Sequence, residues 1–327
     1  MFERLELENF TVFEKASFEW AAGINVFVGA NGTGKTHLLK LLYCLQTNIA
    51  GLLSDKLKGV FRPKDQNLLA LVYEFANEKT ALVTVVGYGQ ARRVSLSNLG
   101  LSLRVSEQLG NQSSVKESPV FVPAKEVLSF APGFLQLYDR FNLAFDEVYR
   151  DIIDLAYTPH QKEIPQDSQP VLDLLQQVIG GMVSVEGDTF LLGSRTMHLV
   201  AEGHRKLALI WQLIRNGSIA SGNTLFWDEP EANLNPIMMQ DVVKVLLMLA
   251  KNGVQIFVAT HSDAFMRELD YQKGDVSTRF FALEKTDKGV VPHPVERYID
   301  VKPNPIEDEY LRLYDLEIQR SLGRANA

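Results

Sequence analysis

The chain has 327 residues, of which 46% are hydrophobic and 22% charged, and its formal net charge at pH 7 is −7. These values are typical of a globular protein, exclude a disordered or fibrous chain, and leave no overall positive charge that would attract nucleic acid. No apolar run reaches the roughly 20 residues that a membrane helix needs, and the opening "MFERLELENF" is too charged for a signal peptide. The single cysteine, Cys44, fits a reducing compartment, so we expect a cytoplasmic protein without a membrane partner.

The first three apolar segments predict strands. "FERLEL" and "ASFEW" alternate apolar and polar residues, whereas "INVFV" is apolar throughout and should be buried on both faces of a parallel sheet. The glycine-rich stretch "GANGTGKT", residues 29–36, follows directly, and the leucine spacing in "HLLKLLYCL" predicts a helix after it. Strand, glycine loop and helix therefore come in the order that a phosphate-binding loop requires.

This loop matches the pattern G-x-x-x-x-G-K-[ST]. Its glycines let the backbone curl, so that successive N–H groups face the β-phosphate of a nucleotide at the positive end of the helix. Lys35 is expected to reach the β- and γ-phosphates, and the Thr36 hydroxyl is expected to bind Mg²⁺. The residues predicted to hold ATP here are Gly29, Asn31, Gly32, Thr33, Gly34, Lys35 and Thr36.

The middle of the chain changes its pattern twice. Between about 68 and 122, the short alternating runs "LLALVYEF", "TALVTVVGY", "RRVSLS" and "LSLRVS" predict an antiparallel sheet, which "SPVFVPAKEVL" closes. From about 125 to 180 apolar residues recur at helical spacing, with a polar break at "TPHQKEIPQDSQP". A hairpin at "MVSVEGDTFLL" follows, and no stretch keeps heptads long enough to predict an extended coiled-coil arm.

Two later strands are predicted to bring reactive side chains to the glycine loop. In "NTLFWDEPEANLNP" an apolar strand ends at Asp228, which can hold Mg²⁺ through water, while Glu229 can orient or deprotonate the attacking water. An exposed acidic turn is the alternative, and the strand before Asp228 argues against it. The strand "VQIFVAT" ends at His261, where an imidazole could contact the γ-phosphate. Three strand ends should thus meet at one nucleotide.

This combination resembles the ABC-type ATPases, in the soluble branch that contains RecF, SMC proteins and OLD-family ATPases. The resemblance rests on "DEPEANLNP", on the strand that ends in "THS", and on the opening "LENFTVFEKASFEWAAGINVFVGANGTGKT". It implies an α/β ATPase head with a mixed or parallel core sheet, an antiparallel β subdomain and an inserted helical lobe. The predicted parts are 1–122 and 182–327 for the two halves of the head, and 123–181 for the helical insertion.

In the family that the chain resembles, two heads hold ATP between them, and a signature segment on one head caps the γ-phosphate held by the other. Its counterpart here is "LVAEGHRKLALIWQLI", where Gly203 lies at a helix start and Ala201 takes the place of the family's serine. Glu202 adds a negative charge, for which Arg205 or Lys206 could compensate. The alternative is the start of an ordinary amphipathic helix.

Other positions are assigned through the same resemblance. "ANLN" matches the D-loop, with Asn235 in place of the usual aspartate, and Gln66 is a candidate for the glutamine loop. Phe13 could stack on adenine or pack in the core. Lys125 and Glu126 could form an ion pair with each other.

Two basic stretches, "DKLKGVFRPK" and "ARRVS", are candidates for DNA contact, with solvated loops as the alternative. Their basic residues are Lys56, Lys58, Arg62, Lys64, Arg92 and Arg93.

Together these features predict a Mg²⁺-dependent ATPase that forms a homodimer, or a higher even oligomer, around ATP. Too little sequence follows the last strands for the nuclease domain of OLD proteins, so we expect a separate nuclease or toxin as effector, in bacterial anti-phage defence. The alternative is a RecF-like ATPase that binds DNA in repair. A transporter ATPase is disfavoured by the altered signature segment and the RecF-like opening.

Overall fold

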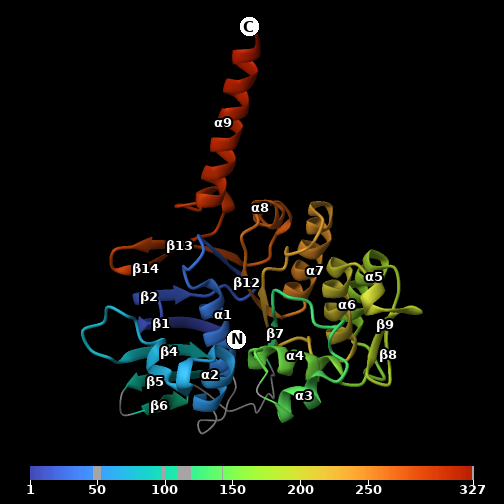
Figure 1. Ribbon diagram of the computed structural model, residues 1–327, viewed down its shortest axis with the longest axis horizontal. Helices are drawn as coiled ribbons and strands as arrows, with labels where there is room; N and C mark the ends of the chain where they lie inside the picture. Colours follow the sequence, from blue (N-terminus) through green and yellow to red (C-terminus); the bar gives the residue numbers. More distant parts are fainter. Residues whose placement is uncertain (47–52, 98–99, 109–118, 142, 326–327) are drawn as a thin grey trace.

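The computed structural model describes residues 1–46, 53–97, 100–108, 119–141 and 143–325 (Figure 1). Its centre is an 11-stranded sheet in the order β6-β5-β4-β1-β2-β14-β13-β3-β12-β11-β7. The parallel part consists of β13 (Thr278–Thr286), β3 (Ile24–Val28), β12 (Gln255–Ala259), β11 (Thr224–Asp228) and β7 (Val120–Val122). The antiparallel part consists of β14 (Gly289–Val295), β2 (Phe13–Glu19), β1 (Phe2–Phe10), β4 (Ala81–Gly87), β5 (Gln90–Ser97) and β6 (Gly100–Gln108).

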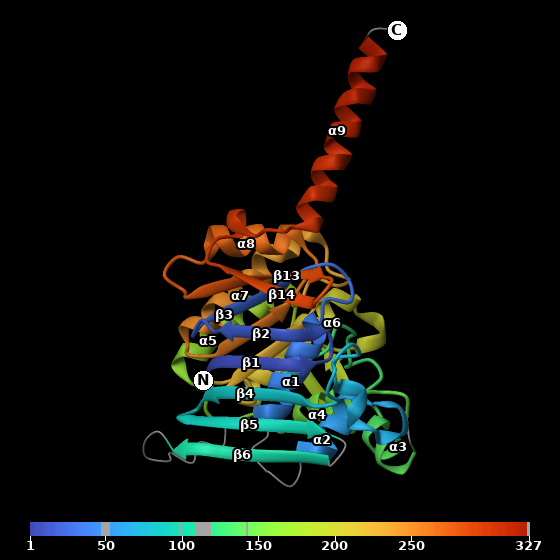
Figure 2. The same ribbon diagram turned by 90° about the vertical axis from the view of Figure 1, so that its left-hand side faces the viewer.

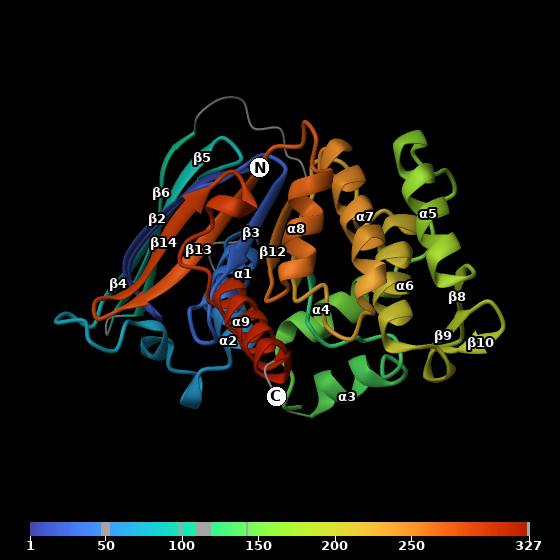
Figure 3. The same cartoon turned by 90° about the horizontal axis from the view of Figure 1, so that it is seen from above.

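Helices cover the parallel part of the sheet, and Figure 3 shows α5 to α8 in a row beside β12. The helices are α1 (Lys35–Gln46), α2 (Leu53–Phe61), α3 (Phe134–Arg140), α4 (Glu147–Ala156), α5 (Gln169–Ile179), α6 (Glu202–Arg215), α7 (Met239–Lys251), α8 (Asp263–Gln272) and α9 (Pro305–Ala325). Short 3₁₀ turns are η1 (Lys64–Gln66), η2 (Leu68–Leu71), η3 (Gln166–Ser168), η4 (Met197–Leu199), η5 (Pro236–Met238) and η6 (Tyr298–Asp300). A separate small antiparallel sheet contains β8 (Val183–Glu186), β9 (Thr189–Leu192) and β10 (Arg195–Thr196).

The expected fold class is confirmed: a mixed core sheet carries helices and a small second sheet. The antiparallel strands continue the core sheet and do not form a sheet of their own. One hydrophobic cluster runs from Val120 through the helices of 123–181 to Val183 and beyond. The boundaries at 122/123 and 181/182 therefore stay predictions, because the packing is continuous across both.

Two details of the predicted strands are wrong. "LLALVYEF" does not form a strand, because Leu68–Leu71 is a 3₁₀ turn whose start is capped by the Asn67 side chain, which accepts a hydrogen bond from Leu69 N at 3.0 Å. "VFV" does not close the antiparallel region either, because β7 pairs in parallel with β11. The other predicted strands and the helical spacing of 125–180 are found in the structure.

The first basic stretch forms α2 and η1, where a solvated loop was the alternative to DNA contact. Lys56 Nζ lies 2.9 Å from Glu147 Oε1 and 2.5 Å from Asp151 Oδ2, both on α4. Arg62 donates to the backbone carbonyls of Leu143 and Phe145. These two cations therefore attach the helical lobe to α2, which the prediction of a DNA contact did not foresee.

A buried glutamine joins the two parts of the sheet at their amino ends. Gln255, the first residue of β12, is fully buried; it accepts from Phe2 N at 2.8 Å and donates to Phe2 O at 2.9 Å and Ala21 O at 3.0 Å. Phe2 belongs to β1, so the chain start is held against the parallel strands. The amino ends of β3 and β12 consequently lie beside the N-terminus.

The last helix, α9, projects from the body, as Figure 2 shows. None of the described helices is both long and apolar enough to cross a lipid bilayer.

Gln255→Leu should lower the free energy of unfolding by about 3 kcal/mol, because three hydrogen bonds are lost and backbone groups of Phe2 are left buried without partners. Urea denaturation measures this change. Gln240→Leu, at an exposed position on α7, is the matched control and should change stability little. Equal stabilities of the two variants would contradict the role given to Gln255.

Candidate nucleotide site

Three neighbouring parallel strands end at one edge of the sheet. β12 pairs with β3 on one side and with β11 on the other. The glycine loop follows β3, Asp228 is the last residue of β11, and His261 comes two residues after the end of β12. Carboxyl ends of parallel strands meet at the same edge, so the predicted convergence is found.

Gly34 shows why the loop needs glycine. Its φ is +85°, and a Cβ at this position would lie 2.7 Å from Val12 Cγ2 and 2.9 Å from Phe13 Cε2. Neither the backbone conformation nor the space permits a side chain. Phe13 itself is fully buried in the hydrophobic core. Of its two predicted roles, core packing is therefore found, and not stacking on adenine.

Lys35 is folded back onto its own loop. Its Nζ donates to Gly29 O at 2.8 Å and to Ala30 O at 3.0 Å. Burial lowers the pKa of Lys35 to about 8, although Asp228 and Glu229 favour the charged form. Nearby anionic oxygens would favour the ammonium form, as expected for a phosphate-binding lysine.

The predicted magnesium ligands lie in contact. Thr36 Oγ1 is 3.0 Å from Asp228 Oδ2 and 3.2 Å from Oδ1. Burial raises the pKa of Asp228 to about 6, and the hydrogen bond from Thr36 opposes that rise. A hydroxyl and a carboxylate are the oxygen ligands that Mg²⁺ prefers, with phosphate oxygens and water completing its shell. The pair fits a nucleotide-bound magnesium ion, and the described part of the chain holds no group of three or more His, Cys, Asp or Glu side chains arranged for a metal.

Glu229 has a strained backbone that is held from two sides. Its φ is +50°, a left-handed conformation that is costly outside glycine. Its N donates to Ala259 O at 2.8 Å, and its O accepts from Lys206 Nζ at 3.4 Å. The side chain remains partly exposed, with Oε1 at 3.9 Å from His261 Nε2. The fixed backbone therefore presents a free carboxylate beside His261.

Glu231 also belongs to this site, and the sequence analysis gave it no role. Its Oε1 accepts from Thr260 Oγ1 and from His261 N, both at 2.7 Å. Burial raises the pKa of this carboxyl group. Burial and a Lys35 charge nearby lower the pKa of His261, which favours a neutral imidazole. The signal that could have revealed Glu231 is the alternation of two glutamates after the strand, in "DEPE".

Comparison with known protein families decides the family. Residues 91–267 match the domain family described as "AAA domain, putative AbiEii toxin, Type IV TA system", and residues 4–99 match a second family described as "AAA domain". The chain belongs to the first of these AAA-domain families. The match spans β11 and β12, with Asp228, Glu229 and His261.

The chain is also similar to RecF proteins in sequence and to SMC heads in fold. It is 46% identical over 43 residues to the DNA replication and repair protein RecF of Cytophaga hutchinsonii, and 27% identical over 118 residues to RecF of Streptococcus suis. These matches cover 11% and 32% of the two relatives and 13% and 36% of this chain. The head of an SMC protein, solved with the C-winged helix domain of ScpA, shares the fold with a TM-score of 0.61 at 15% identity, over 92% of this chain and 99% of that one. The AAA-domain matches, the RecF relatives and the shared SMC-head fold together support an ABC-type ATPase of the RecF/SMC branch.

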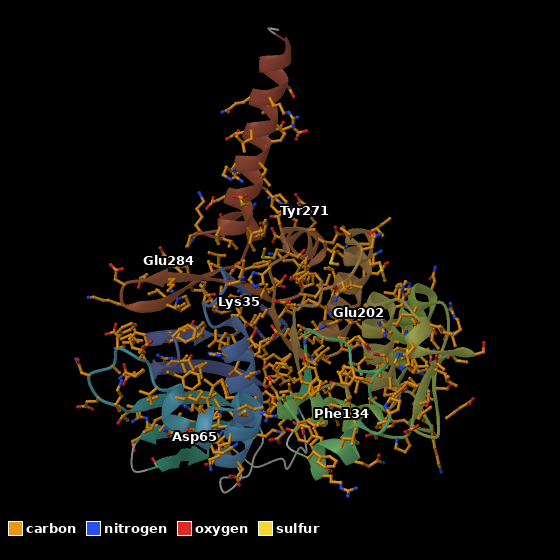
Figure 4. The ribbon with its side chains drawn as sticks, viewed as in Figure 1. Lys35, Asp65, Phe134, Glu202, Tyr271 and Glu284 are labelled. Atoms are coloured by element: carbon orange, nitrogen blue, oxygen red, sulfur yellow. The ribbon has the colours of Figure 1, made fainter. Side chains whose placement is uncertain are left out.

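The segment predicted as the signature does not lie beside the glycine loop of the same chain. Figure 4 shows Lys35 and Glu202 in different halves of the molecule. Helix α6 begins at Glu202, Ala201 before it is exposed, and Gly203 is buried against the D-loop, where a Cβ would lie 2.6 Å from Leu234 Cδ2. Asn233 Nδ2 donates to Glu202 Oε1 at 2.7 Å. Signature segment and D-loop therefore form one surface.

Of the two cations predicted to compensate Glu202, Arg205 pairs with another carboxylate, whereas the pKa of Lys206 is lowered by burial and raised by the nearby Glu202 charge. Arg205 Nη1 lies 3.1 Å from Glu126 Oε1, so the ion pair of Glu126 is formed with Arg205 and the prediction of a pair with Lys125 is wrong. Lys206 is buried and contacts the Glu229 carbonyl.

The remaining family positions are exposed. Asn235 accepts a hydrogen bond from Ile237 N at 3.1 Å and begins η5, which leaves its predicted contact across a dimer untested. Gln66 lies on η1, and its assignment to the glutamine loop stays a prediction.

Lys35→Ala should weaken the binding of a fluorescent ATP analogue by about 10- to 100-fold, since a charged hydrogen bond to phosphate is lost. Fluorescence anisotropy measures the affinity, and circular dichroism checks the fold. The exposed Lys251→Ala on α7 is the matched control and should bind normally. Normal binding by Lys35→Ala would refute the phosphate-binding loop.

Glu231→Ala should speed hydrogen–deuterium exchange of the segment 255–262 by about tenfold, because Thr260 Oγ1 and His261 N lose their shared acceptor. Glu231→Gln keeps a side-chain carbonyl at this position and should exchange nearly as slowly as the natural protein. Mass spectrometry of the peptides measures the rates. Equal protection in the alanine and glutamine variants would show that Glu231 does not hold the strand end.

Proposed function

We propose that this protein hydrolyses ATP to ADP and phosphate with Mg²⁺, in a dimer that closes around the nucleotide. The observation that carries the proposal is the contact of Thr36 with both carboxylate oxygens of Asp228. It joins the phosphate-binding loop to the strand end at which Glu229 is presented. Phosphate-binding, metal-binding and water-activating groups are thereby assembled at one edge.

Each side chain has a chemical task in this reaction. Glu229 accepts a proton from the attacking water, whose oxygen forms a bond to the γ-phosphorus while the bond to the β,γ-bridging oxygen breaks. Lys35 binds the phosphates, and His261, held through its backbone by Glu231, contacts the γ-phosphate. When bound by Thr36 and, through water, by Asp228, Mg²⁺ would neutralise charge on the phosphates.

The second copy supplies the missing cap of the γ-phosphate. Figure 4 shows Lys35 and Glu202 on different sides of the body, an arrangement that supports capping by Ala201 and Gly203 of a second head. The N–H groups at the start of α6 are suited to a phosphate. Closure then lasts as long as the γ-phosphate is present, and hydrolysis releases it.

The closed dimer acts as a switch on a separate effector, a nuclease or toxin, in bacterial anti-phage defence. The family description links the matched AAA domain itself to a putative toxin of a type IV TA system, and the separate effector is part of the proposal.

A RecF-like role in DNA repair is the second candidate, and the RecF relatives favour it. Lys56 and Arg62 are committed to internal contacts, so a DNA surface would use other cations, such as the exposed Lys64 and Arg93. Affinity for duplex DNA that falls steeply with salt concentration would support this candidate.

Glu229→Gln should lower kcat by about 100- to 10,000-fold, because the water loses its proton acceptor, and it should leave ATP binding unchanged. A coupled ATPase assay and anisotropy of the fluorescent analogue measure the two effects. Glu284→Gln, on β13, is the matched control and should keep full activity. An ATPase rate near normal in Glu229→Gln would refute the assignment of the base.

A further inference from the structure

Helix α9 carries large apolar side chains in the open. They are 40% to 62% exposed: Tyr310, Leu311, Leu313, Tyr314, Leu316 and Ile318. Figures 1 and 2 show the helix standing clear of the body along most of its length. Most of the stability of helices in proteins comes from packing an apolar face against other parts of the structure. A partner surface is therefore expected.

Four of these side chains form a stripe. Leu311, Tyr314 and Ile318 follow one another at spacings of three and four residues, and Tyr310 lies next to them on the helix. This is the spacing of a coiled-coil seam, in which such residues meet their counterparts on a second helix. We call Tyr310, Leu311, Tyr314 and Ile318 the α9 stripe.

The direction of α9 is fixed by contacts with the nucleotide edge. Arg267 on α8 lies 2.8 Å from Glu307 in the first turn of α9 and 2.7 Å from Asp263. Asp263 also accepts from the Tyr298 hydroxyl, to which Asn304 donates at 3.0 Å. Because Asp263 begins α8 two residues after His261, the base of α9 is tied to the end of β12.

The geometry of a closed dimer identifies what covers the stripe. If each Lys35 faces the signature segment of the other copy, the two-fold axis must pass between Lys35 and Glu202. Figure 4 shows Lys35 and Glu202 side by side across the body, while α9 projects out of the body above them. The two α9 helices then point in the same direction on the same side of the dimer.

The helices also lean toward one another in such a dimer. The amino ends of β3 and β12 lie beside the N-terminus, so their carboxyl ends, with the nucleotide edge, lie on the opposite side. Figures 2 and 3 show α9 leaning away from the N-terminus, toward the nucleotide edge. Closure of two nucleotide edges therefore brings the two α9 stripes together.

We propose that the α9 stripe pairs in parallel with the α9 stripe of a second copy when ATP closes the heads. This pairing rests on the proposed function, because ATP-dependent closure brings the helices together. Two heptads are too short for a stable coiled coil in dilute solution, but joining the heads raises the effective concentration of the helices to about the millimolar range. The helix pair forms with closure and separates after hydrolysis.

The test is cysteine cross-linking in full-length Glu229→Gln protein. Ile318→Cys lies in the stripe, and Gln319→Cys, the next residue on a polar part of the helix, is the matched control. Cys44 is fully buried and burial raises the pKa of its thiol, so the protein without an added cysteine serves as the blank. Disulfide formation under mild oxidation is measured on denaturing gels, and light scattering gives the mass of the same samples.

With ATP and Mg²⁺, Ile318→Cys should cross-link about tenfold faster than without nucleotide and about tenfold faster than Gln319→Cys, because pairing gives a high effective concentration. A dimer by light scattering with equal, slow cross-linking of both variants would overturn the helix pairing and leave the proposed function standing. Absence of a dimer with ATP would overturn both. Fast cross-linking of Ile318→Cys without nucleotide would also overturn the pairing as an ATP-dependent contact.

Discussion

The hydrogen bonds from Thr36 to Asp228 join two side chains that are 192 residues apart in the chain. They depend on the parallel pairing of β3, β12 and β11, which places the glycine loop and the acidic strand end at one edge of the sheet. Gln255 holds the opposite ends of these strands to β1. The nucleotide site is therefore a consequence of strand order, and the antiparallel strands and helices keep that order fixed.

Around this contact, the buried side chains of Glu231 and Lys206 bind neighbouring residues at the strand ends. The carboxylate of Glu229 remains partly exposed. Glu231 binds the Thr260 hydroxyl and the His261 amide, and Lys206 binds the Glu229 carbonyl. Lys206 lies on α6, so the segment expected to meet a partner is joined to the strained residue expected to activate water. Through this contact the proposed closure of two heads would act on Glu229.

The sequence was sufficient to predict the site wherever the signal is local. Apolar strands lead directly to the glycine loop, to Asp228 and Glu229, and to His261. Because the carboxyl ends of parallel strands meet at one edge of a sheet, these residues could be predicted to lie together. Prediction failed where partners come from distant elements: Glu126 pairs with Arg205, and Lys56 with α4. The 3₁₀ turn at Leu68–Leu71 was missed because capping by Asn67 outweighed an apolar pattern that also suits a strand. The direction of α9 depends on Arg267 and Tyr298 and could not be predicted from its own residues.

The proposed function requires the signature segment of one copy to complete the nucleotide site of another. Sedimentation of Glu229→Gln with saturating ATP and Mg²⁺, with and without Ala201→Arg, tests this most directly, because Ala201 is exposed directly before α6. A dimer is expected without the arginine and a monomer with it, while both proteins bind the fluorescent ATP analogue. A dimer that Ala201→Arg leaves intact, or a monomer in both cases, would contradict it.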